Sequence, residues 1–70
     1  MERKEFEERW KKVGSPKKAI YIGNNGGYMV AVDYDIEQNY ISIFTGELEY
    51  SYSGLFRLED IRDIEEFEEY

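Results

Sequence analysis

Few side chains in this chain can carry out acid–base or nucleophilic chemistry. The 70 residues include no histidine and no cysteine, so such chemistry would depend on carboxylates and tyrosines. Asp33 and Asp35 are the most regular carboxylate pair, and on a strand they lie on one face, ~6.6–6.8 Å apart. Paired carboxylates can hydrolyse glycosides, but a domain of this size has little room for a substrate cleft. We therefore expect no enzyme activity and no cofactor.

Two loop-like segments have some features of ligand-binding loops. Residues 33–44 begin like a calcium loop, but such a loop needs glycine at its sixth position and glutamate at its twelfth. The chain has Gln38 and Phe44 at these positions. The glycine-rich residues 23–27 precede a strand-like run rather than a helix, which does not suit a phosphate site. The sequence therefore predicts no metal site and a hairpin turn at 23–27.

The charge of the chain is unevenly distributed. The net charge is −7, with an excess of basic residues over 1–20 and of acidic residues over 21–70. An acidic surface repels a phosphate backbone and attracts a basic partner, so direct nucleic-acid binding is not expected. No apolar run is long enough to span a membrane, and no signal-peptide pattern is present. We expect a single domain over 1–70, located in the cytoplasm and not in a membrane.

Hydrophobic spacing predicts one helix followed by four strands. Phe6, Trp10 and Val13 form one apolar stripe over residues 2–13, and Gly14 is in the position of a C-terminal helix cap. Alternating residues predict strands at about 18–23, 28–36, 40–45 and 47–53. Turn signals between the strands predict an antiparallel meander.

Two turns predict which face of the sheet is buried. A two-residue loop at Gln38 and Asn39 places Ile36 opposite Ile41, and a type II′ turn at Gly46 and Glu47 places Ile43 opposite Tyr50. The predicted buried face consists of Val30, Val32, Tyr34, Ile36, Ile41, Ile43, Leu48, Tyr50 and Tyr52. The predicted displayed face consists of Met29, Ala31, Asp33, Asp35, Tyr40, Ser42, Phe44, Glu49 and Ser51. In the first hairpin, a three-residue loop over 24–26 places Ile20 and Ile22 inside and Tyr21 outside, whereas an even-length loop would invert them.

The C-terminal residues 57–69 admit two interpretations. Leu58, Ile61, Ile64 and Phe67 recur every three residues, which favours a helical segment. The predicted fold is then α+β, with an N-terminal helix, a four-stranded antiparallel β-meander and a C-terminal helical segment. Alternatively, a turn at 58–62 and a strand at 63–67 would give an SH3-like small β-barrel with an N-terminal helix.

The displayed face suggests a role in recognition. Aromatic side chains beside carboxylates are typical of interaction surfaces, and we expect a protein partner that is basic. The predicted partner-binding residues are Phe44, Tyr40, Asp33, Asp35 and Glu49. Self-association into a homodimer through the same face is a further hypothesis.

The acidic C-terminal region supports an alternative function. Carboxylates at regular spacing can imitate a phosphate track, so the chain could inhibit a DNA- or RNA-binding enzyme as a nucleic-acid mimic. The residues of this alternative acidic surface are Glu59, Asp60, Asp63, Glu65 and Glu66.

Overall fold

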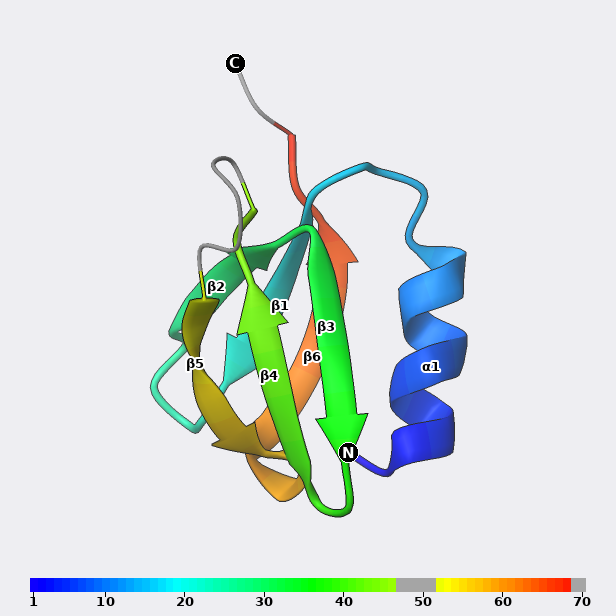
Figure 1. Ribbon diagram of the computed structural model, residues 1–70. Helices are drawn as coiled ribbons and strands as arrows, with labels where there is room; N and C mark the ends of the chain where they lie inside the picture. The colour runs from blue at the N-terminus through cyan, green and yellow to red at the C-terminus, as the bar shows by residue number, and fades with distance from the viewer. Residues whose placement is uncertain (47–51, 69–70) are drawn as a thin grey trace.

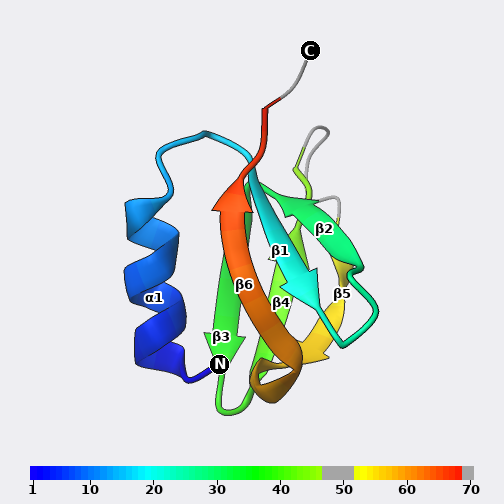
Figure 2. The ribbon, with the colours of Figure 1, turned by 180° about the vertical axis from the view of Figure 1, so that it is seen from behind.

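The part of the chain that the structure describes consists of one N-terminal helix and six strands. The computed structural model describes residues 1–46 and 52–68. The elements in order are α1 (Arg3–Lys12), β1 (Lys18–Ile22), β2 (Tyr28–Ala31), β3 (Asp33–Glu37), β4 (Tyr40–Phe44), β5 (Tyr52–Arg57), the 3-10 helix η1 (Leu58–Asp60) and β6 (Ile61–Glu66). The strands form two three-stranded antiparallel sheets, ordered β2-β1-β6 and β3-β4-β5. Helix α1 lies to one side of both sheets, next to β3 and β6 (Figures 1 and 2). Among the described residues, no helix is long and apolar enough to cross a membrane.

Helix α1 buries the stripe predicted from the sequence. Phe6 is fully buried, and Trp10 and Val13 pack against the core. The ring centroids of Phe6 and Trp10 each lie 4.8 Å from that of Tyr34 on β3, both in edge-to-face geometry, which favours aromatic packing. Arg9, Lys11 and Lys12 occupy the last turn, where positive charge suits the helix dipole. The predicted helix is confirmed, with ends one residue inside the predicted range at each side.

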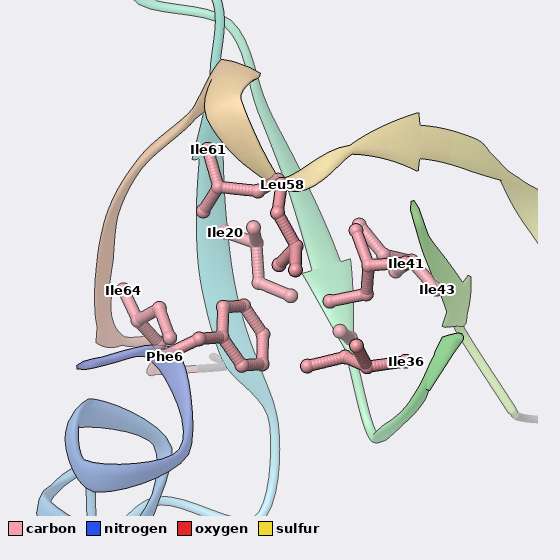
Figure 3. Packing of buried hydrophobic residues seen from close by; sticks show 9 residues of the cluster. Phe6, Ile20, Ile36, Ile41, Ile43, Leu58, Ile61 and Ile64 are labelled. Carbon is pink, nitrogen blue, oxygen red and sulfur yellow. The ribbon is translucent and has the colours of Figure 1, made fainter. Parts of the chain in front are cut away.

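A single core lies between the two sheets. The sheet β2-β1-β6 contributes Ile20, Ala31, Ile61 and Ile64, and the sheet β3-β4-β5 contributes Ile36, Ile41 and Ile43. Leu58 of η1 and Phe6 of α1 complete it, and Figure 3 shows the Phe6 ring pointing into this cluster. The core is therefore built from isoleucines of both sheets and one helical phenylalanine.

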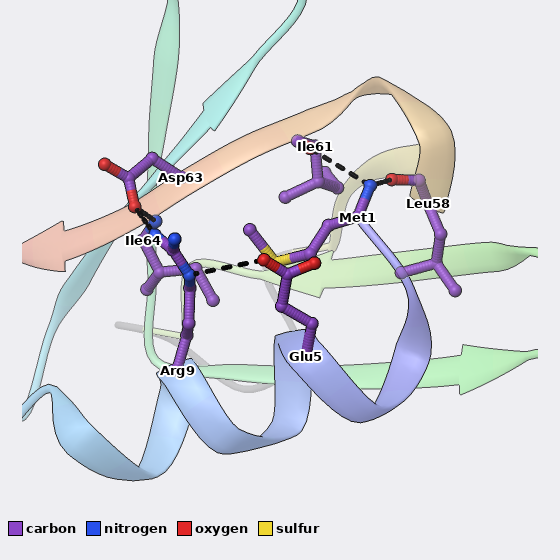
Figure 4. A network of polar contacts seen from close by, with 7 residues as sticks. All are labelled: Met1, Glu5, Arg9, Leu58, Ile61, Asp63 and Ile64. Atoms are coloured by element: carbon purple, nitrogen blue, oxygen red, sulfur yellow. Dashed lines mark hydrogen bonds and ion pairs between the residues drawn. The ribbon is translucent and has the colours of Figure 1, made fainter.

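Polar contacts attach α1 to η1 and β6 (Figure 4). The α-amino group of Met1 donates hydrogen bonds to the carbonyl oxygens of Leu58 at 2.8 Å and Ile61 at 3.3 Å. Arg9 forms an ion pair with Asp63 on β6 and a second, looser one with Glu5. These contacts fix both ends of the helix against η1 and β6.

The middle hairpin has the predicted register. Ile36 lies opposite Ile41, Tyr34 opposite Ile43, and Asp35 opposite Ser42. Gln38 has a φ of 55°, the positive value that a tight two-residue hairpin loop requires at its first position. The prediction for β3 and β4 is therefore confirmed.

The predicted continuous strand 28–36 is wrong. The chain leaves the first sheet after Ala31 and enters the second at Asp33. Ala31 is fully buried opposite Lys18, whereas Val30 lies opposite Ala19 on the outer side and Val32 is half-buried. The change of sheet at Val32 reverses the alternation, so the expected faces hold for β3 but not for β2. In the first hairpin the orientation of β1 is as predicted, since Ile20 is buried and Tyr21 points outward. The predicted three-residue loop is wrong, because Ile20 lies opposite Met29 instead of Val30 and β2 is therefore turned over.

The predicted C-terminal helical segment is also wrong. Residues 58–60 form η1 and residues 61–66 form β6, which pairs with β1. Asp63 lies opposite Tyr21, but the next pair joins Ile61 to Ile22, so Arg62 is an extra residue in the strand. Such a bulge lets two residues three positions apart point the same way. Ile61 and Ile64 are therefore both buried on a strand, and their spacing imitates that of a helix.

The third hairpin differs from its prediction as well. Ile43 lies opposite Gly54 and Ile41 opposite Phe56, instead of Tyr50 and Tyr52. Glu47, Leu48, Glu49, Tyr50 and Ser51 lie outside the described residues. The four-stranded meander is overturned because β3, β4 and β5 form one sheet while β2 belongs to the other. The alternative interpretation was right that a helical turn and a strand end the fold, as η1 and β6 show, but the described pairings divide six strands between two sheets instead of giving five in one barrel.

High pH is expected to destabilise the fold through two tyrosines. Burial, followed by the charges of Glu7 and Asp33, raises the pKa of Tyr34, and a hydrogen bond to Glu65 raises the pKa of Tyr21. Because the folded state holds these phenolic protons more tightly than the unfolded state, the free energy of unfolding should fall as pH rises above about 10. Urea unfolding at pH 9 and pH 11 measures the effect, and the double variant Tyr21→Phe/Tyr34→Phe should lose less stability over this interval than the parent. An equal loss in both proteins would contradict the assignment.

Candidate binding surface

The outer face of the sheet β3-β4-β5 is the surface singled out by the sequence. Along β3 and β4, Tyr34, Ile36, Ile41 and Ile43 belong to the core or pack against it. The alternate side chains therefore point outward. In both views α1 lies beside this sheet and does not cross that face (Figures 1 and 2). The outward side chains of the described strands are Asp33, Asp35, Glu37, Tyr40, Ser42, Phe44, Leu55 and Arg57.

The predicted residues occupy this face with different exposure. Asp33 and Asp35 are exposed, and Tyr40 is 42% exposed. Phe44 is half-buried and lies directly opposite Asp33. The Asp33 carboxylate accepts a hydrogen bond from the Tyr34 backbone N–H at 2.7 Å, which fixes its orientation. Glu49 lies outside the described residues, so the structure places four of the five predicted residues on one face.

Three further residues of this face were missed, namely Glu37, Leu55 and Arg57, the last of which lies opposite Tyr40. Glu37 lies opposite Tyr40 and continues the alternation of Asp33 and Asp35, so strand parity alone could have identified it. Leu55 lies opposite Ser42 and is 57% exposed. It was missed because the sequence placed the last strand at 47–53, whereas β5 covers Tyr52–Arg57.

A small hollow in this face combines apolar and acidic groups. Its volume is about 200 Å³. Leu55 and Tyr40 supply exposed apolar surface, and Asp35 and Glu37 supply negative charge. The full lining is Asp35, Glu37, Gln38, Tyr40, Ser42 and Leu55. An exposed leucine and tyrosine beside two carboxylates form an amphipathic site at the surface of the sheet.

A larger groove of about 780 Å³ adjoins the hollow and shares Gln38 and Tyr40 with it. The groove lies between the start of α1, the β3–β4 turn and η1, and contains Arg3 and Arg57 as well as acidic residues. Arg57 is itself paired with Glu59 at 3.5 Å. Because side chains of both charges line the groove, it has no uniform charge that would favour a cation or an anion. The smaller hollow has the more uniform charge.

The alternative acidic surface does not form one row of carboxylates. Its members are Glu59, Asp60, Asp63, Glu65 and Glu66. Glu59 and Asp60 are exposed on η1, and the charge of Asp63 is balanced by Arg9. Glu65 and Glu66 are adjacent in β6 and therefore point to opposite sides of the strand. The mimic hypothesis stays a prediction, and this arrangement offers it no continuous track.

The described residues contain no group of three or more acidic side chains placed to hold a metal ion. No protein family, curated protein or solved structure matches this chain.

Proposed function

We propose that the protein binds a basic protein partner through the outer face of β3-β4-β5. The observation that carries this proposal is the hollow beside Tyr40, where exposed apolar surface adjoins Asp35 and Glu37. Long cationic side chains have an apolar stem and a charged head. The stem of a lysine or arginine can pack on Leu55 and Tyr40 while its head reaches the two carboxylates. The hollow is complementary to such a side chain in both polarity and charge.

The charges around the hollow favour the same class of partner. Asp33, Asp35 and Glu37 follow one another along the outer side of β3 and are all exposed. Their summed potential attracts positive segments and speeds encounter at low ionic strength. The exposed Leu55 and Tyr40 provide the apolar contact that holds a complex once it has formed. The proposed complex should therefore weaken with added salt but not vanish.

A titration with defined peptides tests the proposal. The probe is a short peptide of alternating lysine and threonine, with a glutamate–threonine peptide of the same length as its control. Addition of the lysine peptide to isotope-labelled protein should shift the backbone amide resonances of Asp35, Tyr40 and Leu55. The glutamate peptide should leave them unchanged.

Two variants make this test specific to the hollow. The double variant Asp35→Asn/Glu37→Gln should bind the lysine peptide about three- to tenfold more weakly, because two charge-assisted contacts are lost. Leu55→Ser should weaken it about threefold through loss of apolar contact. Glu8→Gln, on the exposed side of α1, removes one negative charge away from the hollow, against two in the double variant, and is the control for the effect of net charge. Equal weakening by Glu8→Gln and by the double variant, or no weakening by the latter, would refute the proposed site.

A further inference from the structure

The outer face of the other sheet carries a second group of aromatic and acidic side chains. Tyr21 lies on the central strand β1, with Tyr28 opposite it on β2 and Asp63 opposite it on β6. Glu65 follows Asp63 on the same side of β6, next to Ala19. Seen from behind, α1 lies beside this sheet and leaves its outer face open (Figure 2). These four side chains are thus displayed together on the side of the molecule away from the first hollow.

The two tyrosines form an open pair of rings. Their centroids are 5.4 Å apart and their planes are inclined by 41°. Tyr28 is 52% exposed, and its partner Tyr21 is half-buried. A cation is attracted to the negative face of an aromatic ring. Because these rings are inclined rather than stacked flat, the solvent side of the pair offers ring surface to such a cation.

The neighbouring carboxylates add negative charge at the same place. The Tyr21 hydroxyl donates a hydrogen bond to Glu65, so the Glu65 side chain is held close to the ring. Asp63 is balanced by Arg9 and contributes less. The arrangement thus combines two neighbouring rings with one nearby carboxylate, Glu65.

We infer that Tyr21, Tyr28 and Glu65 form a second binding site, which takes the cationic side chain of a lysine or arginine on a basic polypeptide. The cation would lie against the exposed Tyr28 ring and the accessible part of the Tyr21 ring, with the Glu65 carboxylate as its counter-ion. The site shares no residue with the hollow on β3-β4-β5, so it does not depend on the function proposed above. A basic chain could then be held at two faces, or two basic segments could be joined by one copy of this protein.

The same lysine–threonine peptide tests this site when resonances of the second sheet are followed. Binding should shift the amide resonances of Tyr21, Tyr28 and Glu65. Tyr28→Leu should weaken this second binding event about two- to fivefold, because it keeps an apolar side chain but removes the ring. Tyr28→Phe keeps the ring and should bind within about twofold of the parent. Glu65→Gln should weaken binding by an amount similar to Tyr28→Leu.

The outcomes separate the two sites. Unchanged binding by Tyr28→Leu or by Glu65→Gln overturns the inference, and so does equal weakening by Tyr28→Phe and Tyr28→Leu, because the ring face would then have no role. Shifts confined to β3-β4-β5 would overturn the second site and leave the first intact. Shifts confined to β2-β1-β6 would support the second site and overturn the site on β3-β4-β5. If Tyr28→Leu fails to fold by circular dichroism, Tyr28→Phe combined with Glu65→Gln decides the matter, since loss of the counter-ion alone must then weaken binding.

Discussion

Phe6→Ala is expected to unfold a large fraction of the protein at room temperature. Phe6 is fully buried, is the only residue of α1 in the buried core, and contacts Trp10 and Tyr34 through its ring. Removal of a buried phenylalanine ring costs about 3–5 kcal/mol through lost transfer energy and the cavity left behind. Small domains have stabilities at the low end of roughly 5–15 kcal/mol. The loss is therefore comparable to the whole stability.

Urea unfolding followed by circular dichroism measures this effect. Phe6→Leu should lower the free energy of unfolding by about half as much as Phe6→Ala, because leucine fills part of the space between the sheets. Glu8→Ala, on the exposed side of the same helix, should change the free energy of unfolding by less than ~0.5 kcal/mol. A loss below ~1 kcal/mol for Phe6→Ala would mean that α1 is dispensable for the packing of the two sheets.

The parts of the fold that follow from local pattern could be predicted from the sequence. The stripe of α1 is recognisable because Phe6 and Trp10 are one helical turn apart on an otherwise charged segment. The register of β3 and β4 follows from a two-residue loop between runs of alternating side chains, in which a slip by one residue would expose Ile41 and Ile43. In both cases neighbours in sequence determine the structure.

The change of sheet at Val32 could not be predicted in this way. Residues 28–36 form one continuous strand-like run, with no glycine or proline to mark a break. The break is produced by distant partners, since Lys18 pairs with Ala31 while Phe44 pairs with Asp33. The Val32 N–H also donates a hydrogen bond to the carbonyl of Phe44 at 2.9 Å. Closure of the two sheets on one core, rather than local propensity, fixes the bend.

The C-terminal strand shows how a bulge can mislead a periodicity argument. Ile61 and Ile64 are three residues apart and both buried. On a regular strand, residues three apart point to opposite faces, so they could not both face one core. The sequence does contain a signal against a helix, because Glu65, Glu66 and Glu68 oppose the dipole at the expected helix end. Together with the β-branched isoleucines, these charges favour a strand over a helix.

The residues of the candidate surface were predicted correctly where the pairing of their strands was predicted correctly. Asp33, Asp35 and Tyr40 lie on the correctly paired hairpin, and the structure places them together on its outer face. Leu55 depends on the third strand, whose predicted position was too early in the chain. The hollow lies between residues that the pairing of β4 with β5 brings together, so the predicted position of the last strand could not indicate it.

Gly46→Ala is expected to destabilise the protein more than substitution of any freely exposed glycine. Gly46 has a φ of +62°, and a Cβ added there would lie 2.1 Å from the Cγ2 atom of Val32. The positive φ costs a residue with a side chain about 1–2 kcal/mol, and forcing apart such a contact costs about 1–3 kcal/mol more. Val32 is the residue at which the chain changes sheet, and its β-branched side chain has little rotational freedom. The clash therefore falls on the bend that joins the two sheets.

Two comparisons separate the backbone cost from the clash. Gly26 also has a positive φ, of 78°, but an added Cβ there would meet no atom within 4 Å, so Gly26→Ala should lose only the backbone part, about 1–2 kcal/mol. In the background of Val32→Ala, Gly46→Ala should lose about as much as Gly26→Ala, because the blocking methyl group is gone. Thermal and urea unfolding of Gly46→Ala, Gly26→Ala, Val32→Ala and the double variant Val32→Ala/Gly46→Ala give the coupling energy between positions 32 and 46. A coupling near zero would show that Val32 can move aside without cost, and that the approach of Gly46 to the bend does not constrain the path of the chain between the sheets.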